Sequence, residues 1–203
     1  MQATEILMNE HRIIEQVLDC LDTLVRQTTA TRRLDSASAL QILDFLRHFA
    51  DQCHHAKEEE LFFPLLEKQG FSRDRGPTGV MMHEHTLGRL YIKEMAQAVS
   101  AAASGDQPAI DRFCRVGKGY VQLLREHIRK EDHCLFDMAD KACSAADDAQ
   151  LLEAFARVEH EDIGDAVHEN YLHLADELAD RFGIRREATA ALAGCGCGCG
   201  THA

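Results

Sequence analysis

Apolar residues recur at alternating three- and four-residue steps along four long stretches of this 203-residue chain. This spacing marks the buried stripe of an amphipathic helix, because residues three or four apart share one face. We expect helices over residues 4–27, 36–69, 77–104 and 108–143. Short polar segments connect them, so the sequence predicts an all-α, up-down four-helix bundle.

A fifth amphipathic pattern runs from about Leu151 to Phe182, and we expect it to form a helix that packs on the bundle. The predicted organisation is a bundle at 1–143, a fifth-helix segment at 144–183 and a flexible tail at 184–203. The tail ends in GCGCGCGTHA, a low-complexity run with little to bury. Pro64 lies inside the second helix and should kink it.

Each of the four stripes carries a histidine where an aliphatic residue would be expected: His11, His54, His85 and His127. Two of them are followed four residues later by a glutamate, namely Glu58 and Glu131. Buried imidazoles and carboxylates are costly unless a partner satisfies them. Because these positions converge in one core, they predict a shared partner, and a pair of metal ions is the simplest one.

Helical phase separates neighbouring candidates on the second helix. His55 and Glu59 have the same four-residue spacing as His54 and Glu58, but they fall on a polar edge of the helix. His54 and Glu58 lie in phase with the apolar stripe. We therefore expect His54 and Glu58 to be the ligands.

On the fourth helix, Glu131 continues the stripe, while Asp132 lies about 100° around the helix axis. Glu131 is therefore the expected ligand, and the same phase places Cys134 and Met138 on the stripe. Histidines off the stripes are expected on solvated faces: His48, His55, His83 and His133.

The type of donor narrows the choice of metal. Imidazole nitrogen with carboxylate oxygen suits iron, manganese or zinc better than calcium, and the lack of thiolates among these donors disfavours an iron–sulfur cluster. Four histidines and two glutamates exceed what one ion needs, so two metals roughly 3.5 Å apart are expected. Glu58 and Glu131 would bridge them, as carboxylates do in di-iron bundles.

Four segments together resemble the hemerythrin-like, HHE cation-binding family: NEHRIIEQVL, CHHAKEEELFFPLLE, MMHEHTLGRLY and REHIRKEDHCLF. The resemblance covers residues 1–142 and implies two iron ions, bridged by an oxo or hydroxo group, in a four-helix bundle. It carries the family's ligands onto His11, His54, Glu58, His85, His127 and Glu131. It also implies O2 binding, reaction with peroxide or nitric oxide, or iron handling.

The chain departs from the oxygen carriers of that family, whose third helix supplies two histidines four residues apart. Here Met81 and Arg89 stand four residues before and after His85. The carriers also use a five-residue His-to-Asp spacing on the fourth helix, whereas this stripe favours His127 with Glu131. One imidazole fewer leaves a position for water or substrate, which favours chemistry on a bound ligand over reversible O2 carriage.

The fifth-helix segment offers further donors: His160, Glu161 and His168. They are either partly exposed residues of a cover helix or a source of one more ligand. Three tyrosines likewise either pack between helices or donate to a bound oxygen species: Tyr91, Tyr120 and Tyr171.

Charge and cysteine content limit the partners. The formal net charge of −12 argues against nucleic acid or an anionic membrane surface. No apolar run approaches the ~18 residues that span a bilayer, and Met1 leads directly into a helical pattern, so neither a membrane span nor an N-terminal signal is expected.

Five cysteines lie singly on helices, which is typical of reduced thiols in a cytoplasmic protein. In the tail, Cys195, Cys197 and Cys199 form either a metal- or redox-sensitive element or a segment without a defined role.

These observations favour a cytoplasmic di-iron protein that binds a small diatomic or peroxide ligand and reacts with it, as in peroxidase- or catalase-like detoxification. The alternative is a non-catalytic iron, oxygen or redox sensor, or a store or donor of iron. A plain bundle with structural histidines is disfavoured, because all four stripes carry one. The physiological oxidant, the reductant and the oligomeric state stay open.

Overall fold

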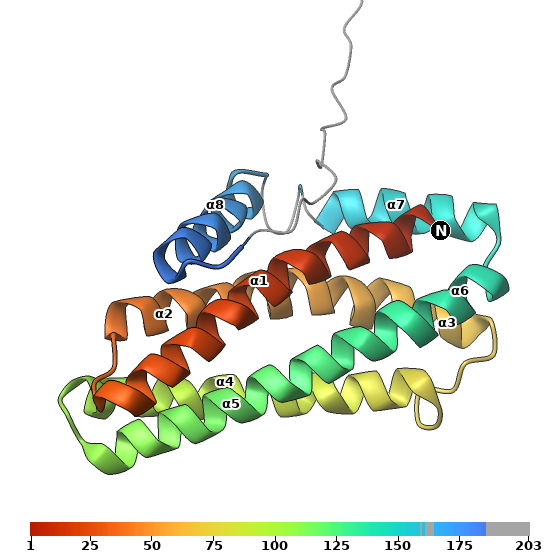
Figure 1. Cartoon of the computed structure of the whole chain (residues 1–203). Helices are drawn as coiled ribbons and strands as arrows, with labels where there is room; N and C mark the ends of the chain where they lie inside the picture. Colours follow the sequence, from red (N-terminus) through yellow and green to blue (C-terminus); the bar gives the residue numbers. More distant parts are fainter. Residues whose placement is uncertain (159, 161–164, 186–203) are drawn as a thin grey trace, which may run out of the picture.

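A computed structural model describes residues 1–158, 160 and 165–185, and all regular structure within these ranges is helical. The four helices of the bundle are α1 (Gln2–Thr31), then α2 (Ser36–Phe45) with η1 (Leu46–His55), η2 (Glu58–Phe62) and α3 (Phe63–Lys68), then α4 (Pro77–Ala103), then α5 (Gln107–Lys130) with η3 (Glu131–Leu135) and α6 (Phe136–Ala142). They pack side by side as an elongated bundle (Figure 1). The predicted all-helical bundle is confirmed.

The C-terminal segment contains two described helices, α7 (Ala145–Arg157) and α8 (Asp165–Phe182), where the sequence predicted one. α7 begins earlier than expected, because Ser144 and Asp147 form a capping box. Both helices lie along the side of the bundle formed by α1 and the second helix (Figure 1). Residues 159, 161–164 and 186–203, which include Glu161 and the tail cysteines, lie outside the described residues.

Three segments of the second and fourth helices, η1, η2 and η3, wind as π-helix. A π-helical turn contains more residues than an α-helical turn, so the phase of the buried stripe shifts beyond it. At the end of η3 and in the first turn of α6, Leu135 and Phe136 are buried, while Cys134 and Met138 are exposed. The prediction that Cys134 and Met138 lie on the stripe was wrong, because it assumed an unbroken α-helix. Pro64 lies in the first turn of α3, directly after η2.

The apolar core is split into two clusters with a polar layer between them. Along α1, Leu7 belongs to one cluster and Ile14 to the other, and His11 lies between them. α4 crosses the same layer at His85. Apolar side chains on both sides therefore exclude water from the polar layer. Within the described ranges, no helix is long and apolar enough to cross a bilayer.

Candidate metal centre

The structure brings all six residues that the sequence singled out into one buried cluster: His11 on α1, His54 at the end of η1, Glu58 at the start of η2, His85 on α4, His127 on α5 and Glu131 at the start of η3. Each of the six is at most 1 % exposed. Their assignment as ligands stays a prediction, which the geometry of the cluster supports.

Each of the two glutamates faces two histidines from different helices. The two carboxylate oxygens of Glu58 lie 3.5 Å from His54 Nε2 and 3.4 Å from His85 Nε2. One oxygen of Glu131 lies 3.3 Å from His11 Nε2 and 3.1 Å from His127 Nε2. Each carboxylate therefore lies within reach of two imidazoles from different helices, which is a donor arrangement that fits a cation site.

Several atoms of this cluster lack hydrogen-bond partners among the described residues. They are Nε2 of His11, Nε2 of His54 and both carboxylate oxygens of Glu58 and of Glu131. A buried polar atom without a partner costs about 1–3 kcal/mol, so this group is unfavourable unless a cation satisfies it. Imidazole nitrogen and carboxylate oxygen together fit iron, manganese or zinc.

The opposite nitrogen of each histidine is paired with a carboxylate. The Nδ1–carboxylate distances are 2.6 Å for His11–Asp132, 2.9 Å for His54–Glu10, 2.7 Å for His85–Glu59 and 3.0 Å for His127–Glu84. A proton on Nδ1 leaves the Nε2 lone pair free to bind a metal, and such carboxylates raise the basicity of the ligand. The four imidazoles are therefore oriented with Nε2 toward the centre of the cluster.

Each of these carboxylates is also held by a cationic side chain: Asp132 by Arg12, Glu10 by Lys57, Glu59 by Arg89 and Glu84 by Lys130. The pair of Glu10 and Lys57 is almost completely buried, and the Lys57 ammonium lies 5.8 Å from the centre of the Phe155 ring. Burial opposes ionisation of Glu10, but the charge of Lys57 and the contact with His54 outweigh it and lower the pKa of Glu10 to about 2. The carboxylate is therefore ionised at neutral pH.

The protonation of the cluster reflects its surplus of carboxylates. Burial disfavours protonated His11 and His127, but the surrounding acids outweigh it and raise their pKa values to about 9 and about 10. Burial likewise opposes a charged Glu131, yet the neighbouring imidazoles hold its pKa well below the usual range. Without a metal, protons occupy the positions that a cation would take, so metal binding must displace them.

His55 is buried in the same cluster, although the sequence placed it on a solvated face. Its ring stacks on that of His85 with 3.8 Å between ring centres. The prediction failed because η1 winds as π-helix, which turns consecutive residues through a smaller angle than an α-helix does. Of the other histidines off the stripes, His83 and His133 are exposed as expected, while His48 is half-buried.

The sequence analysis missed the supporting carboxylates, although each is adjacent to a candidate ligand. Glu10 and Glu84 precede His11 and His85, while Glu59 and Asp132 follow Glu58 and Glu131. Each carboxylate nevertheless contacts a histidine of another helix, so reading one helix at a time could not pair them. The usable signal was the pattern His-x-x-Lys-Glu-acid, which occurs at 54–59 and again at 127–132.

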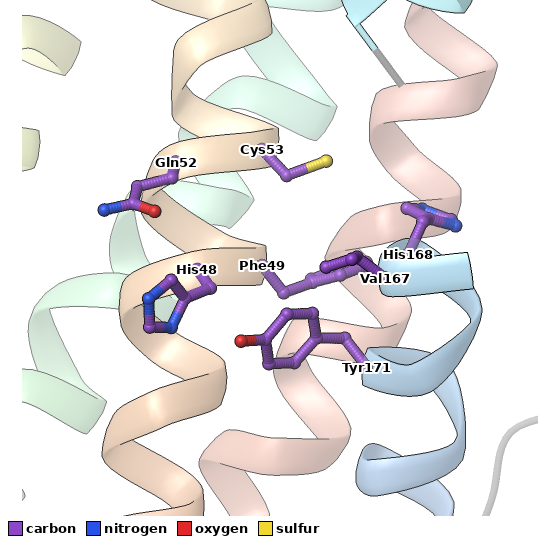
Figure 2. A pocket seen from close by; sticks show the side chains of 7 residues that line it. All are labelled: His48, Phe49, Gln52, Cys53, Val167, His168 and Tyr171. Atoms are coloured by element: carbon purple, nitrogen blue, oxygen red, sulfur yellow. The ribbon is translucent and has the colours of Figure 1, made fainter. Parts of the chain in front are cut away.

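A pocket of about 220 Å³ lies between η1 and α8, beside the cluster. Figure 2 shows Cys53 and His168 at its wall. Ligand atoms of Cys53 and His168 lie within 4.8 Å of each other and of Glu10, and His168 belongs to neither of the two groups that contain the six residues and His55. His160 is exposed. The described part of the fifth-helix segment therefore brings no donor to the main cluster, and Tyr171, whose hydroxyl contacts Asp44, faces the pocket.

A helical bundle with a buried group of imidazoles and carboxylates defines a cation-binding domain. Residues 2–139 match the hemerythrin HHE cation-binding domain, and the chain belongs to that family. It is 28 % identical over 178 residues to uncharacterized proteins of Mycobacterium tuberculosis and Mycobacterium bovis, a match that covers 88 % of this chain and 68 % of each relative. No solved structure gives a significant match. The predicted family is thereby confirmed.

Proposed function

We propose that the chain binds two iron ions and uses them to bind and reduce a small oxidant such as O2, H2O2 or NO. The observation that carries this proposal is the set of buried donors from four helices, in which Glu58 and Glu131 each span two histidines and several atoms have no hydrogen-bond partner among the described residues. Two redox-active metals, when bound, could each give or take one electron, so together they would supply two-electron chemistry.

The surroundings of the cluster favour a small ligand. All six candidate ligands are at most 1 % exposed, and apolar clusters lie on both sides of them. A site buried to this degree favours a diatomic molecule or peroxide over a larger substrate. The surrounding side chains also exclude bulk water, which strengthens electrostatic interactions with a bound anion.

The protein's own contribution is the orientation of the donors. The four carboxylates at the Nδ1 atoms fix the tautomer of each imidazole, and loss of one such partner typically costs 10–100-fold in metal affinity or activity. Burial opposes ionisation of Glu10, Glu59 and Glu84, but their imidazole and cationic partners outweigh it and lower the pKa values of these three carboxylates. We further propose a cytoplasmic location, because none of the five cysteines in the described ranges forms a disulfide.

Anaerobic reduction of the iron-loaded chain, followed by mixing with H2O2 or NO, tests this function. We expect rapid oxidation or a nitrosyl spectrum, and turnover when a reductant is supplied. Stable iron loading without any reaction would contradict the proposal and favour the alternative of an iron store, donor or sensor. His54→Ala should bind fewer than two irons and lose the reaction, whereas His83→Ala, which alters an exposed histidine on α4, should keep two irons and the reaction.

A further inference from the structure

A second group of metal-binding side chains lies beside the main cluster, at the pocket between η1 and α8. It consists of Glu10 on α1, Cys53 on η1 and His168 on α8. One ligand atom of each residue lies within 4.8 Å of the other two. Donors around a single tetrahedral ion are about 3.5 Å apart, so small rotations of these side chains would bring all three onto one cation.

The packing of α8 positions His168 at this pocket. Tyr171 lies one turn further along the same face of α8, and its hydroxyl donates a hydrogen bond to Asp44 at 3.2 Å. The ring of His168 packs on that of Phe49, with 5.4 Å between the ring centres. Figure 2 shows the resulting arrangement, in which Cys53 comes from η1 and His168 from α8. Three separate helical segments therefore converge on one point.

The imidazole of His168 carries a nitrogen that lacks a partner. Its Nε2 is buried and has no hydrogen-bond partner among the described residues. Such an atom is unfavourable unless something satisfies it. Glu10 and Cys53 beside it are each 2 % exposed, so a cation held by the three side chains would satisfy this nitrogen away from bulk water.

Glu10 can bind a cation without giving up its present contacts. Its Oε2 lies 2.9 Å from His54 Nδ1, and its Oε1 accepts a hydrogen bond from Lys57. A carboxylate offers about four lone-pair sites, so a third partner can be added. An ionised Cys53 and Glu10 would bring two negative charges to a divalent cation, and the formal net charge of −12 would offset the remaining charge of Lys57.

We propose that Glu10, Cys53 and His168 bind one divalent cation of the zinc type, at a mononuclear site outside the main cluster. Thiolate, imidazole and carboxylate are the donors that zinc takes in proteins, and three of them leave a fourth position for water or a ligand. The order of metal affinities places zinc and cobalt above ferrous iron at such a site. This site does not depend on the proposed dinuclear centre, whose donors are imidazoles and carboxylates.

Titration of the metal-free full chain with Co2+ tests the site. A bond between cobalt and a thiolate gives an intense charge-transfer band in the near ultraviolet, which imidazole and carboxylate donors do not give. The titration uses a background in which the tail cannot contribute thiolates: Cys195→Ser, Cys197→Ser and Cys199→Ser. We expect this background chain to show the band with the amplitude of one cobalt-bound thiolate, and excess Zn2+ should remove it.

Substitutions in the same background assign the donors. Cys53→Ser should abolish the band, and His168→Ala should weaken Co2+ binding at this site by more than about 10-fold, because loss of a residue that only supports a ligand already costs that much. His173→Ala, which alters an exposed histidine of α8, and Cys143→Ser, which alters a half-buried thiol, should leave the band unchanged. Circular dichroism checks that each variant is folded, and the half-buried position of His168 makes its variant the safer one. Absence of the band in the background chain, or an unchanged band in Cys53→Ser or His168→Ala, would overturn the proposal.

Discussion

Replacement of Glu10 by glutamine should affect stability and metal affinity through two separate contacts. The side chains of Glu10 and Lys57 are 3 % and 0 % exposed, and they form an ion pair. Removal of one partner of a buried ion pair typically costs about 3–5 kcal/mol, because the remaining charge has no water to solvate it. Glu10→Gln should therefore lower the free energy of unfolding of the metal-free chain by about 3 kcal/mol.

Glu84→Gln is the matched control, because Glu84 occupies the equivalent place beside His127. Its partner Lys130 is 42 % exposed, and Glu84 itself is 14 % exposed. Water can solvate the Lys130 charge after the substitution, so the cost should be about 1 kcal/mol or less. In both variants a histidine loses its charged Nδ1 partner, so both should bind metal about 10–100-fold more weakly.

Urea unfolding of the metal-free variants and competition with a metal-binding dye measure these two effects separately. The double variant Glu10→Gln with Lys57→Met should regain most of the lost stability, because it also removes the buried ammonium group, but it should not regain metal affinity. Equal losses of stability in Glu10→Gln and Glu84→Gln would refute the reasoning from burial. Unchanged metal affinity in both would refute the role assigned to the Nδ1 carboxylates.

Three further predictions concern pH, the neighbouring pocket and helix packing. Because the pKa values of His11 and His127 are raised from 6.5 to about 9 and about 10, the stability they contribute is complete below pH 6.5 and is lost as pH rises through those values. Urea unfolding of the metal-free chain should therefore show falling stability from pH 6.5 to 10, and a flat profile would contradict these pKa shifts. His168→Ala should retain two irons per chain by elemental analysis, since His168 lies outside the main cluster, and loss of one would place His168 among the ligands of that cluster. Gly117→Ala should lower the melting temperature more than Gly88→Ala does. The added Cβ would lie 2.9 Å from the Val25 side chain at position 117 but 3.6 Å from Tyr120 at position 88. Equal melting temperatures would show that the core adjusts freely.

Helical periodicity predicted the bundle and the convergence of its polar positions. The stripes on α1 and α4 continue without interruption, so His11 and His85 were located correctly from spacing alone. Their burial follows from the apolar periodicity in the sequence of each helix. Glu131 lies at the first residue of η3, before the phase has shifted. Glu58 follows η1, but it stays beside His54 because the two are four residues apart.

Residue spacing predicted the wrong faces at and beyond the π-helical turns, and it could not predict contacts between helices. His55 was assigned to the surface because a regular α-helix would turn it about 100° away from His54, and nothing in the local sequence indicated the wider turn of η1. The partners of the imidazoles were missed for a different reason. Glu10 is adjacent to His11 in the sequence but contacts His54 on another helix, and such a pairing depends on how the helices pack.

The number of metal ions per chain tests the central claim most directly. Elemental analysis of the full chain loaded with ferrous iron, after removal of unbound metal, should give two irons per chain. His54→Ala should fall below two, and the surface variant His83→Ala should stay at two. A wild-type value of one or zero, or two irons in His54→Ala, would contradict a dinuclear centre built on these histidines.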